Sequence, residues 1–381
     1  MLAIGLMSGT SLDGVDAALV EIEKEKFNLI KFITLNYDEK FRKKVMKNLN
    51  DDTAKLSEIC SLNFEFGNWF VETIDKLLEN TDYAYNDIDF VASHGQTIWH
   101  NPKQNGDLVP STLQIGEGSV ISTKTGITTV TNFRCADIVV GGEGAPLVPM
   151  SEYMLFKSNE ENIILQNIGG IGNLTYLKKS CSLDEVVAFD TGPGNVMIDY
   201  FVKKYFGLPF DDCGKIAMNG SVISEVVDYL MNDEVIKQIP PKSTGREKYS
   251  EAFMEKMAKK FDFEKRNKED VIATMAYFTA SSICYQYQNF IKKFDKVVVS
   301  GGGSHNKFIL KTMEEILKVP VMTQEDLGYS SDAKEAIAFV VLGYLTLMRK
   351  SGNVIGATGA RENVVLGNIY LGKKELKWAS I

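Results

Sequence analysis

Short apolar runs separated by glycine-rich polar turns organise the chain. The first run, Leu2–Met7, is short enough for one buried strand, and a second apolar run extends from Val15 to Ile22. Between them, the segment 8–16 reads SGTSLDGVD, with two glycines, three hydroxyls and two aspartates. A turn of this composition offers backbone N–H groups and hydroxyls to phosphate oxygens. An ordinary β-hairpin turn explains the same residues.

The same strand–turn–strand pattern returns in the second half of the chain. A strand over Asn162–Gln166 is followed by the turn Asn167–Asn173, NIGGIGN, and by a strand over Leu174–Leu177. Two glycine hairpins, one in each half, indicate a duplicated architecture that holds a ligand between its halves. A chance pair of glycine turns is the alternative.

Strands and helices alternate between these hairpins and after them. Apolar spacings of three to five residues predict helix over 41–78, and a helix that follows Asn195 is expected to stop at Gly207. Val271–Ile283 and Ala336–Met348 predict two buried helices, and the second is too short to span a bilayer. The pattern predicts an α/β layered fold.

Functional side chains follow three predicted strands. The strand 88–92 leads to His94–Thr97, and the strand beginning at Val130 leads to Arg134 and Asp137. Ligands of α/β sheets bind where strands end, so these residues are candidates for a ligand site. A histidine bonded to nearby backbone, and an Arg134–Asp137 pair, are the structural alternatives.

The third such strand, Val186–Phe189, leads to Asp190. A fixed carboxylate at a strand end that faces a cleft is a candidate general base, although an Asx turn also suits Asp190. Gly301–Gly303 follow a further strand and let a flat ring approach the backbone, as an adenine site requires. Asp332 and Glu335 have the spacing of a capping box, so Glu335 has a structural explanation too.

Composition narrows the class of protein. The 381 residues are 44% hydrophobic and 24% charged, as in soluble globular proteins, and we expect neither a membrane span nor a secretion signal. The net charge of −8 disfavours a nucleic-acid surface. Five scattered cysteines suit reduced thiols in a cytoplasm, and the three histidines lack zinc-ligand spacing.

The motifs together resemble the anhydro-N-acetylmuramic acid kinase family, within the superfamily of acetate and sugar kinases, actin and heat-shock ATPases. The matching segments are MSGTSLDGVD (7–16), HGQT (94–97), NFRCAD (132–137), GGEGAPLVP (141–149), NIGGIGN (167–173), FDTGPGN (189–195), KSTGRE (242–247) and TGA (358–360). They span nearly the whole chain in family order. Many superfamily members carry a metal-holding aspartate where this chain has Met7, so the metal ligands stay unassigned.

The resemblance implies a two-lobed, duplicated actin-like ATPase fold of the ribonuclease H-like type with a central cleft. We expect an N-terminal lobe over 1–140 and a C-terminal lobe over 141–381, joined at the glycine-rich loop 141–146, with the C-terminal tail packing back on the first lobe. Two lobes around a cleft imply closure before chemistry.

The resemblance also implies roles for individual residues. Asp190 would deprotonate the attacking water, and Glu335 would be a second catalytic residue on the sugar side. The implied ATP-binding residues are Gly9, Thr10, Ser11, Leu12, Asp13, Gly14, Val15, Asp16, Asn167, Gly169, Gly170, Gly301, Gly302 and Gly303. The implied substrate-binding residues are His94, Gln96, Arg134 and Asp137.

The implied reaction uses ATP and Mg²⁺ on 1,6-anhydro-N-acetylmuramic acid. Water opens the anhydro bridge while O6 takes the γ-phosphoryl group, giving N-acetylmuramic acid 6-phosphate and ADP in cell-wall recycling. The expected enzyme is a cytoplasmic homodimer that binds neither nucleic acid nor membrane. Two alternatives stay open: a kinase for a different sugar on the same scaffold, and a non-catalytic actin-like module that assembles with ATP.

Overall fold

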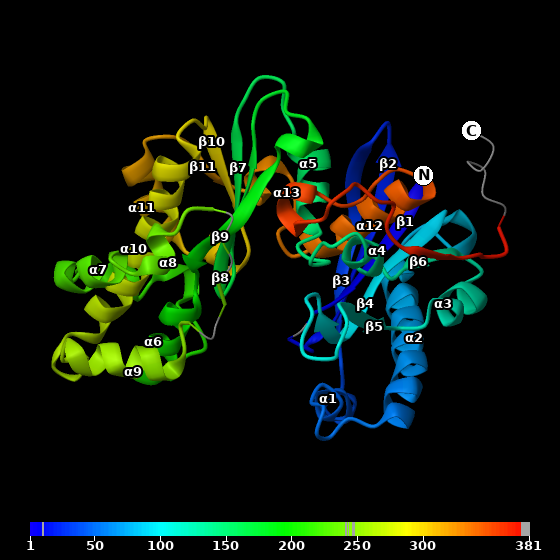
Figure 1. Ribbon diagram of the computed structural model, residues 1–381, viewed down its shortest axis with the longest axis horizontal. Helices are drawn as coiled ribbons and strands as arrows, with labels where there is room; N and C mark the ends of the chain where they lie inside the picture. Colours follow the sequence, from blue (N-terminus) through cyan, green and yellow to red (C-terminus); the bar gives the residue numbers. More distant parts are fainter. Residues whose placement is uncertain (10, 241, 243, 246–247, 375–381) are drawn as a thin grey trace. The chain divides into compact units, whose positions relative to one another are not determined.

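The structure is a computed structural model that describes residues 1–9, 11–240, 242, 244–245 and 248–374. It divides into two compact units (Figure 1). The first unit combines residues 1–155 with 332–381, and the second is the continuous segment 156–331. The expected lobe boundary at 140/141 therefore differs from the observed division. The glycine-rich loop stays in the first unit, where Asp137 Oδ2 accepts a hydrogen bond from the Gly144 N–H at 2.8 Å.

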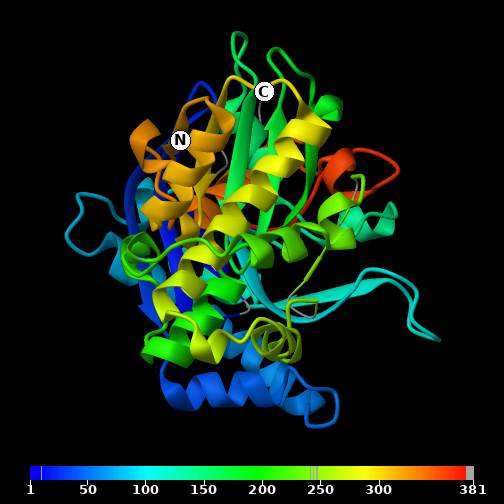
Figure 2. The same cartoon turned by 90° about the vertical axis from the view of Figure 1, so that its left-hand side faces the viewer.

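The first unit is built on one mixed sheet with strand order β12-β6-β4-β1-β2-β3, and β5 also pairs with β4. Its strands are β1 (Leu2–Ser8), β2 (Gly14–Glu23), β3 (Lys26–Asn36), β4 (Phe90–Asn101), β5 (Ser111–Ile115), β6 (Thr128–Thr131) and β12 (Asn368–Tyr370). β1, β2 and β3 form an antiparallel meander, while β1, β4 and β6 run parallel. Figure 2 shows in cyan the long β4–β5 hairpin.

Helices cover both faces of this sheet. They are α1 (Glu39–Lys47), α2 (Leu56–Leu78), α3 (Gly118–Thr125), α4 (Cys135–Val139), α5 (Val148–Phe156), α12 (Lys334–Leu347) and α13 (Ile355–Thr358). Side chains alternate between the faces of a strand, so Ile4 and Leu6 share a buried cluster with α2, while Gly5 faces α12. A Cβ on Gly5 would lie 1.9 Å from the Ala336 carbonyl oxygen, so glycine allows this close helix approach.

The second unit repeats the core of the first. Its sheet order is β11-β10-β7-β8-β9, with β7, β8 and β9 antiparallel and β7, β10 and β11 parallel. The strands are β7 (Ile163–Ile168), β8 (Ile171–Leu177), β9 (Val187–Pro193), β10 (Lys296–Ser300) and β11 (Val321–Thr323). They correspond in order and direction to β1, β2, β3, β4 and β6. The predicted duplication of an α/β unit is thus confirmed.

The helices of the second unit surround one long buried helix. They are α6 (Val196–Phe206), α7 (Ser224–Met231), α8 (Glu234–Lys237), α9 (Glu251–Lys260), α10 (Lys268–Gln286) and α11 (Lys307–Leu317), and α10 continues into the π-helical turn η6 (Tyr287–Ile291). The predicted stop at Gly207 is confirmed, because Gly207 caps α6 with φ 68°. The predicted buried helix 271–283 lies within α10.

Two local predictions were wrong, and one structural alternative does not form. The helix expected over 41–78 is two helices, since α1 ends at Lys47 and α2 begins at Leu56. β4 does not end before His94 but continues to Asn101, because β5 pairs with its second half. The capping box at Asp332 and Glu335 does not form: the N-cap of α12 is Ala333, with no side-chain cap.

Candidate active site

The predicted first phosphate turn joins β1 to β2, and buried side-chain hydrogen bonds at the end of β1 hold it in place. Ser8, the last residue of β1, is buried, and its Oγ lies 2.7 Å from the Tyr37 hydroxyl and 2.6 Å from Gln96 Oε1. Leu12 turns back into the core with φ 56°. The turn residues Ser11 and Asp13 are exposed. Thr10 lies outside the described residues.

Two glycines of this turn differ in what surrounds them. A Cβ on Gly14 would lie 2.4 Å from the Leu35 carbonyl oxygen, so the pairing with β3 requires glycine there. A Cβ on Gly9 would meet only Ser11 Oγ, at 3.8 Å. The protein itself therefore leaves room beside Gly9, the space that a phosphate needs for close approach to the backbone.

Carboxylates of the first unit gather near this turn. Burial raises the pKa of Asp16, the hydrogen bond from Thr34 opposes the shift, and the charges of Asp332 and Asp13 add to it. Desolvation by the surrounding protein also raises the pKa of Glu335, although its side chain keeps solvent-accessible surface. Lys334 opposes that shift, Asp16 adds to it, and Arg134 opposes it more weakly. A carboxyl with a raised pKa can exchange protons closer to neutral pH.

His94 and Arg134 form one hydrogen-bonded unit. Nε2 of His94 accepts from Arg134 Nε at 3.0 Å and faces Arg134 Nη2 at 2.9 Å, while its Nδ1 lies 2.8 Å from the Gly95 carbonyl oxygen. The imidazole is therefore neutral with its proton on Nδ1. Burial first, and then the Arg134 charge, lower the pKa of His94 to about 3. Arg134 Nη1 donates to the Gly144 carbonyl at 2.6 Å, which ties this unit to the glycine-rich loop.

Asp137 lies beneath that loop and not on the surface of the site. Its side chain has no exposed area. Oδ2 accepts from the Gly144 N–H at 2.8 Å, and Oδ1 accepts from Asn353 Nδ2 at 2.9 Å and from Thr358 Oγ1 at 2.8 Å. The alternative of an Arg134–Asp137 pair is not what forms, because each side chain instead bonds Gly144.

A cavity of about 360 Å³ lies within the first unit beside these residues. His94, Asn132 and Cys135 border it, together with Thr112 and Gln114 of β5. This volume falls in the range of small-molecule pockets. Asn132 has φ 60°, an unusual backbone conformation for a residue other than glycine.

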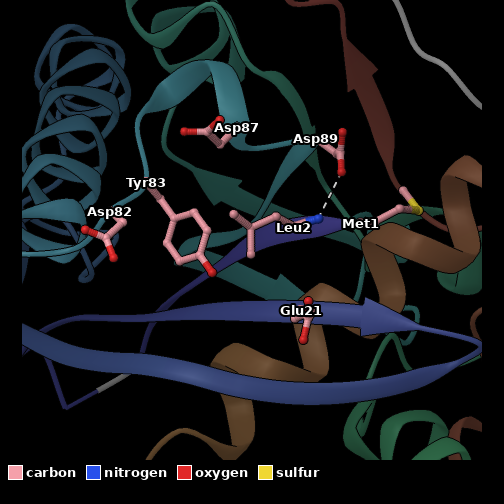
Figure 3. A pocket seen from close by; sticks show the side chains of 7 residues that line it. All are labelled: Met1, Leu2, Glu21, Asp82, Tyr83, Asp87 and Asp89. Atoms are coloured by element: carbon pink, nitrogen blue, oxygen red, sulfur yellow. Dashed lines mark hydrogen bonds between the residues drawn. The ribbon is translucent and has the colours of Figure 1, made fainter.

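A second cavity of the first unit, about 390 Å³, lies at the opposite edge of the sheet, where β1 begins (Figure 3). Its lining is acidic, with Glu21, Asp82, Asp87 and Asp89. Asp89 accepts hydrogen bonds from the Leu2 N–H at 2.9 Å and from Lys374 Nζ at 3.0 Å. Since the predicted site residues lie at the other ends of β1 and β2, this cavity is not part of the candidate site.

The predicted second phosphate turn is the two-residue link Gly169–Gly170 between β7 and β8. Its carbonyls accept hydrogen bonds from the N–H groups at the start of α6: Gly169 from Asn195 at 2.7 Å, and Gly170 from Gly194 at 2.9 Å. A Cβ on Gly194 would lie 2.2 Å from the Gly169 oxygen. On Gly169 itself, the nearest atom to an added Cβ would be 3.5 Å away. As at Gly9, the turn is held rigidly while its outer side stays open.

The predicted adenosine loop packs against this turn. Gly301 has φ 79°, and a Cβ there would lie 2.8 Å from Asn167 Oδ1. A Cβ on Gly303 would lie 2.3 Å from the side chain of Ile168. The fold thus brings together the loop Gly301–Gly303 and the turn after Asn167, which are far apart in the sequence.

The sequence predicted Asp190 at the end of a strand. In the structure it lies inside β9 instead. β9 extends to Pro193, and its register with β8 shifts between Gly172 and Asn173. The shift leaves Thr191 as the bulged residue, fully buried, with its Oγ1 accepting from Gln166 Nε2 at 3.1 Å. Such bulges re-aim neighbouring side chains and occur beside active sites. The Asp190 side chain is half-buried, and its Oδ2 accepts from the Thr244 N–H at 2.8 Å.

The comparison with known proteins identifies the family. A family model described as anhydro-N-acetylmuramic acid kinase matches residues 1–372. The chain belongs to the anhydro-N-acetylmuramic acid kinase family. It is 45% identical to the anhydro-N-acetylmuramic acid kinase of Bacillus cereus strain G9842, over 97% of this chain and 99% of the relative. Identity to that of Clostridioides difficile strain 630 is also 45%, over 97% of this chain and 98% of the relative.

Likeness to solved structures is weaker. The activator of the 2-hydroxyisocaproyl-CoA dehydratase from Clostridium difficile with bound ADPNP is 13% identical, with 90% of this chain and 93% of that chain covered. The TM-score is 0.46, too low to carry an inference about this chain. Membership of the anhydro-N-acetylmuramic acid kinase family makes the chain a phosphotransferase.

Within this family assignment, the predicted residues form two groups, one in each unit. The first unit holds Gly9, Ser11, Leu12, Asp13, Gly14, Val15, Asp16, His94, Gln96, Arg134, Asp137 and Glu335, and the second holds Asn167, Gly169, Gly170, Asp190, Gly301, Gly302 and Gly303. Leu12 and Val15 point into the core, so only their backbone could meet a nucleotide.

Two of the predicted substrate-binding side chains are fully buried. Gln96 and Asp137 have no exposed area, and their side chains bond protein groups. In the structure both side chains therefore bond protein groups, and their predicted contact with substrate stays a prediction. Arg134 is half-buried, and His94, though only 4% exposed, borders the cavity of about 360 Å³.

Sequence reasoning gave no role to Lys242 and Thr244, whose segment binds Asp190. Their motif, KSTGRE, can be recognised in the sequence. Its contact with Asp190 cannot, because the fold brings together residues that lie far apart in the chain. Ser243, Arg246 and Glu247 of the motif lie outside the described residues. In the part of the chain that the structure describes, no cluster of three or more His, Cys, Asp or Glu side chains could hold a metal ion, and no helix could cross a membrane.

Proposed function

We propose that this kinase transfers the γ-phosphoryl group of ATP to O6 of 1,6-anhydro-N-acetylmuramic acid with opening of the anhydro ring. Water attacks C1 and loses a proton to the Asp190 carboxylate, and the C1–O6 bond breaks. The freed O6 attacks the γ-phosphorus, and the bond to the ADP oxygen breaks. The products are N-acetylmuramic acid 6-phosphate and ADP, which places the enzyme in peptidoglycan recycling.

The observation that carries this assignment is that the fold holds the Asp190 carboxylate in a fixed position, in a chain that belongs to this family. The bulge at Thr191 and the Thr244 N–H fix a half-buried carboxylate that can still reach a ligand. A general base has to be held within hydrogen-bond reach of the proton that it takes. The Thr244 N–H holds the carboxylate at Oδ2, and we assign the role of the base to the carboxylate as a whole.

Each glycine turn, within its own unit, is a candidate for contact with ATP phosphates. The free space beside Gly9 and Gly169 supports this, because the protein backbone does not need glycine at either position for its own packing. Gly301–Gly303, packed on the second turn, would border the adenosine. Arg134 and Glu335 would lie on the sugar side, where the raised pKa of Glu335 suits proton exchange with the sugar.

A bound Mg²⁺ would supply positive charge that neutralises the charge developing during phosphoryl transfer. Mg²⁺ needs only one or two protein carboxylates when phosphates and water complete its shell, so the absence of a larger acidic cluster among the described residues fits this use. Asp16 is the best candidate carboxylate. It lies opposite Met7 in the β1–β2 register. Burial first, and then the charges of Asp332 and Asp13, raise its pKa, and a bound cation would offset both effects.

The decisive test is Asp190→Asn. We expect turnover with the anhydro sugar to fall roughly 10²–10⁴-fold, the usual contribution of a general base, while ATP affinity stays within about twofold. Turnover is measured as sugar-dependent ADP release with mass analysis of the product, and ATP affinity by calorimetry. Asp228→Asn, the same change at an exposed position of α7, is the control and should be silent. Near-normal turnover of Asp190→Asn would remove Asp190 from the role.

We further propose that the enzyme is a cytoplasmic homodimer. Family membership and a composition without disulfide spacing support the compartment. Light scattering of the purified protein at assay concentration tests the dimer, and a monomeric mass would refute it. Polymers that form with ATP, without sugar-stimulated turnover, would instead favour an actin-like assembly protein.

A further inference from the structure

Lys242 is a buried cation for which the reaction above has no use. Only 8% of its surface is exposed. Nζ donates to the carbonyl oxygens of Val235 at 2.8 Å and Ile236 at 3.2 Å, both in α8. It also lies 5.6 Å from the ring centroid of Phe290, in the π-helical turn η6. Burying an ammonium group costs free energy, so its position calls for a compensating partner.

The backbone around Lys242 is bonded to Asp190 on both sides. The Asp190 N–H donates to the Lys242 carbonyl at 3.2 Å, and the Thr244 N–H donates to Asp190 Oδ2 at 2.8 Å. β9 is the edge strand of its sheet among the strands that the structure describes. On its open side, Asp190 bonds the backbone of Lys242 and Thr244, and the Lys242 side chain fastens its own backbone to α8.

Charge also links the two residues. Burial lowers the pKa of Lys242 to about 8, and the negative charge of Asp190 opposes that shift. Attraction between two groups is mutual, so the ammonium favours the ionised carboxylate that a base requires. Two other charged side chains at the ends of α8 have partners of their own: Asp233 pairs with Lys248 at 3.2 Å, and Lys237 donates to Asn232 at 2.7 Å.

We propose that Lys242 is a positioning residue for Asp190: its side chain anchors to α8 the backbone that bonds Asp190, and it adds a positive charge near the carboxylate. This proposal rests on the proposed role of Asp190 as the base. Lys242 does not touch substrate, because its Nζ is directed to the α8 carbonyls. Its effect should therefore appear in kcat and in the pH profile, and not in the affinity for ATP.

The test is a double-mutant cycle of Lys242→Met and Asp190→Asn. We expect Lys242→Met to lower kcat about 10–100-fold, since small displacements of catalytic groups cost up to about 10² in rate. The acid limb of its kcat–pH profile should move to higher pH, because the carboxylate loses a neighbouring cation. In the Asp190→Asn background, the same substitution should change kcat less than about threefold, because its partner is already inactive.

Two controls make the outcome specific. Lys248→Met removes a nearby but exposed lysine and should leave kcat and the pH profile unchanged. Lys242→Gln keeps a donor toward α8 without the charge, and should shift the pH profile with a smaller loss of kcat. Thermal unfolding shows which variants are folded. If Lys242→Met does not fold, Lys242→Gln replaces it in the double-mutant cycle.

Separate results would overturn separate claims. Wild-type kcat and pH profile in a folded Lys242 variant would refute the positioning role, and so would equal losses from Lys242→Met in both backgrounds. Near-normal turnover of Asp190→Asn alone would refute the base assignment instead.

Discussion

His94 is held neutral in the folded protein, and this makes stability depend on pH. Its Nε2 faces two N–H groups of Arg134. A proton added to Nε2 would turn this acceptor into a donor that faces the two donors of Arg134. Burial and Arg134 lower its pKa to about 3, against 6.5 in the unfolded chain. Because the unfolded chain takes up this proton first, the stabilising contribution is complete above pH 6.5 and is lost as pH falls from 6.5 towards 3.

We therefore expect His94→Gln to flatten the pH dependence of stability. Glutamine can accept from Arg134 without titrating, so the variant should lose less of its melting temperature between pH 6.5 and 4 than the wild type does. Thermal unfolding across this range measures the effect, and His305→Gln, at an exposed histidine, should keep the wild-type slope. Equal slopes for His94→Gln and the wild type would contradict the assignment.

Asp137, predicted to bind substrate, joins three segments of the first unit through its buried carboxylate. Its carboxylate joins the glycine-rich loop at Gly144 to Asn353 and Thr358, which follow more than 200 positions later in the sequence. Asp137→Ala would leave these donors buried without an acceptor, and we expect the free energy of unfolding to fall by about 3 kcal/mol. Chemical denaturation measures the loss. Asp107→Ala, at an exposed position, should cost nothing, and an equally silent Asp137→Ala would refute this role.

In the glycine hairpins, the structure distinguishes glycines that the packing of the protein requires from glycines that it does not require. Gly9→Ala meets no protein atom closer than 3.8 Å, so the fold should accept it. If phosphates approach this backbone, the added methyl group should raise KM for ATP at least about tenfold, equivalent to about 1.4 kcal/mol of binding. Unchanged KM with unchanged stability would place the phosphates elsewhere.

Gly194→Ala, just before α6 and against the turn of the second hairpin, gives the opposite expectation. Its methyl group would overlap the Gly169 carbonyl oxygen, at 2.2 Å, where the start of α6 meets the turn. Overpacking of this kind costs about 1–3 kcal/mol, so the melting temperature should fall before any effect on nucleotide affinity is considered. A variant as stable as the wild type would show that the turn yields without cost.

At the scale of the whole molecule, the first unit is discontinuous and the second is not. α12, almost wholly buried, comes from after residue 331 and covers one face of the β1 sheet. We expect the fragment 156–331 to fold alone, and the fragment 1–155 to fold only when 332–381 is co-expressed. Circular dichroism and proteolysis of the fragments test this, and a stable, cooperatively unfolding 1–155 would refute it.

Much of the fold was predictable because it depends on local signals. The apolar runs of β1 and β7, the stop of α6 at Gly207 and the apolar composition of α10 and α12 need only neighbouring residues to be read. The continuation of β4 through His94 was not predictable in the same way. It depends on pairing with β5, whose partner residues lie beyond a loop.

The chain alone determined its family, its duplicated strand–turn–strand plan and the residue types available for phosphoryl transfer, since these are properties of short motifs and their order. Tertiary structure decided which of those residues meet solvent. Gln96 and Asp137 became buried supports, and Asp190 came to lie at a bulge held by Lys242 and Thr244. The physical reason is that a polar side chain in the interior has to find its hydrogen-bond partners wherever the fold supplies them, and here they come from distant segments.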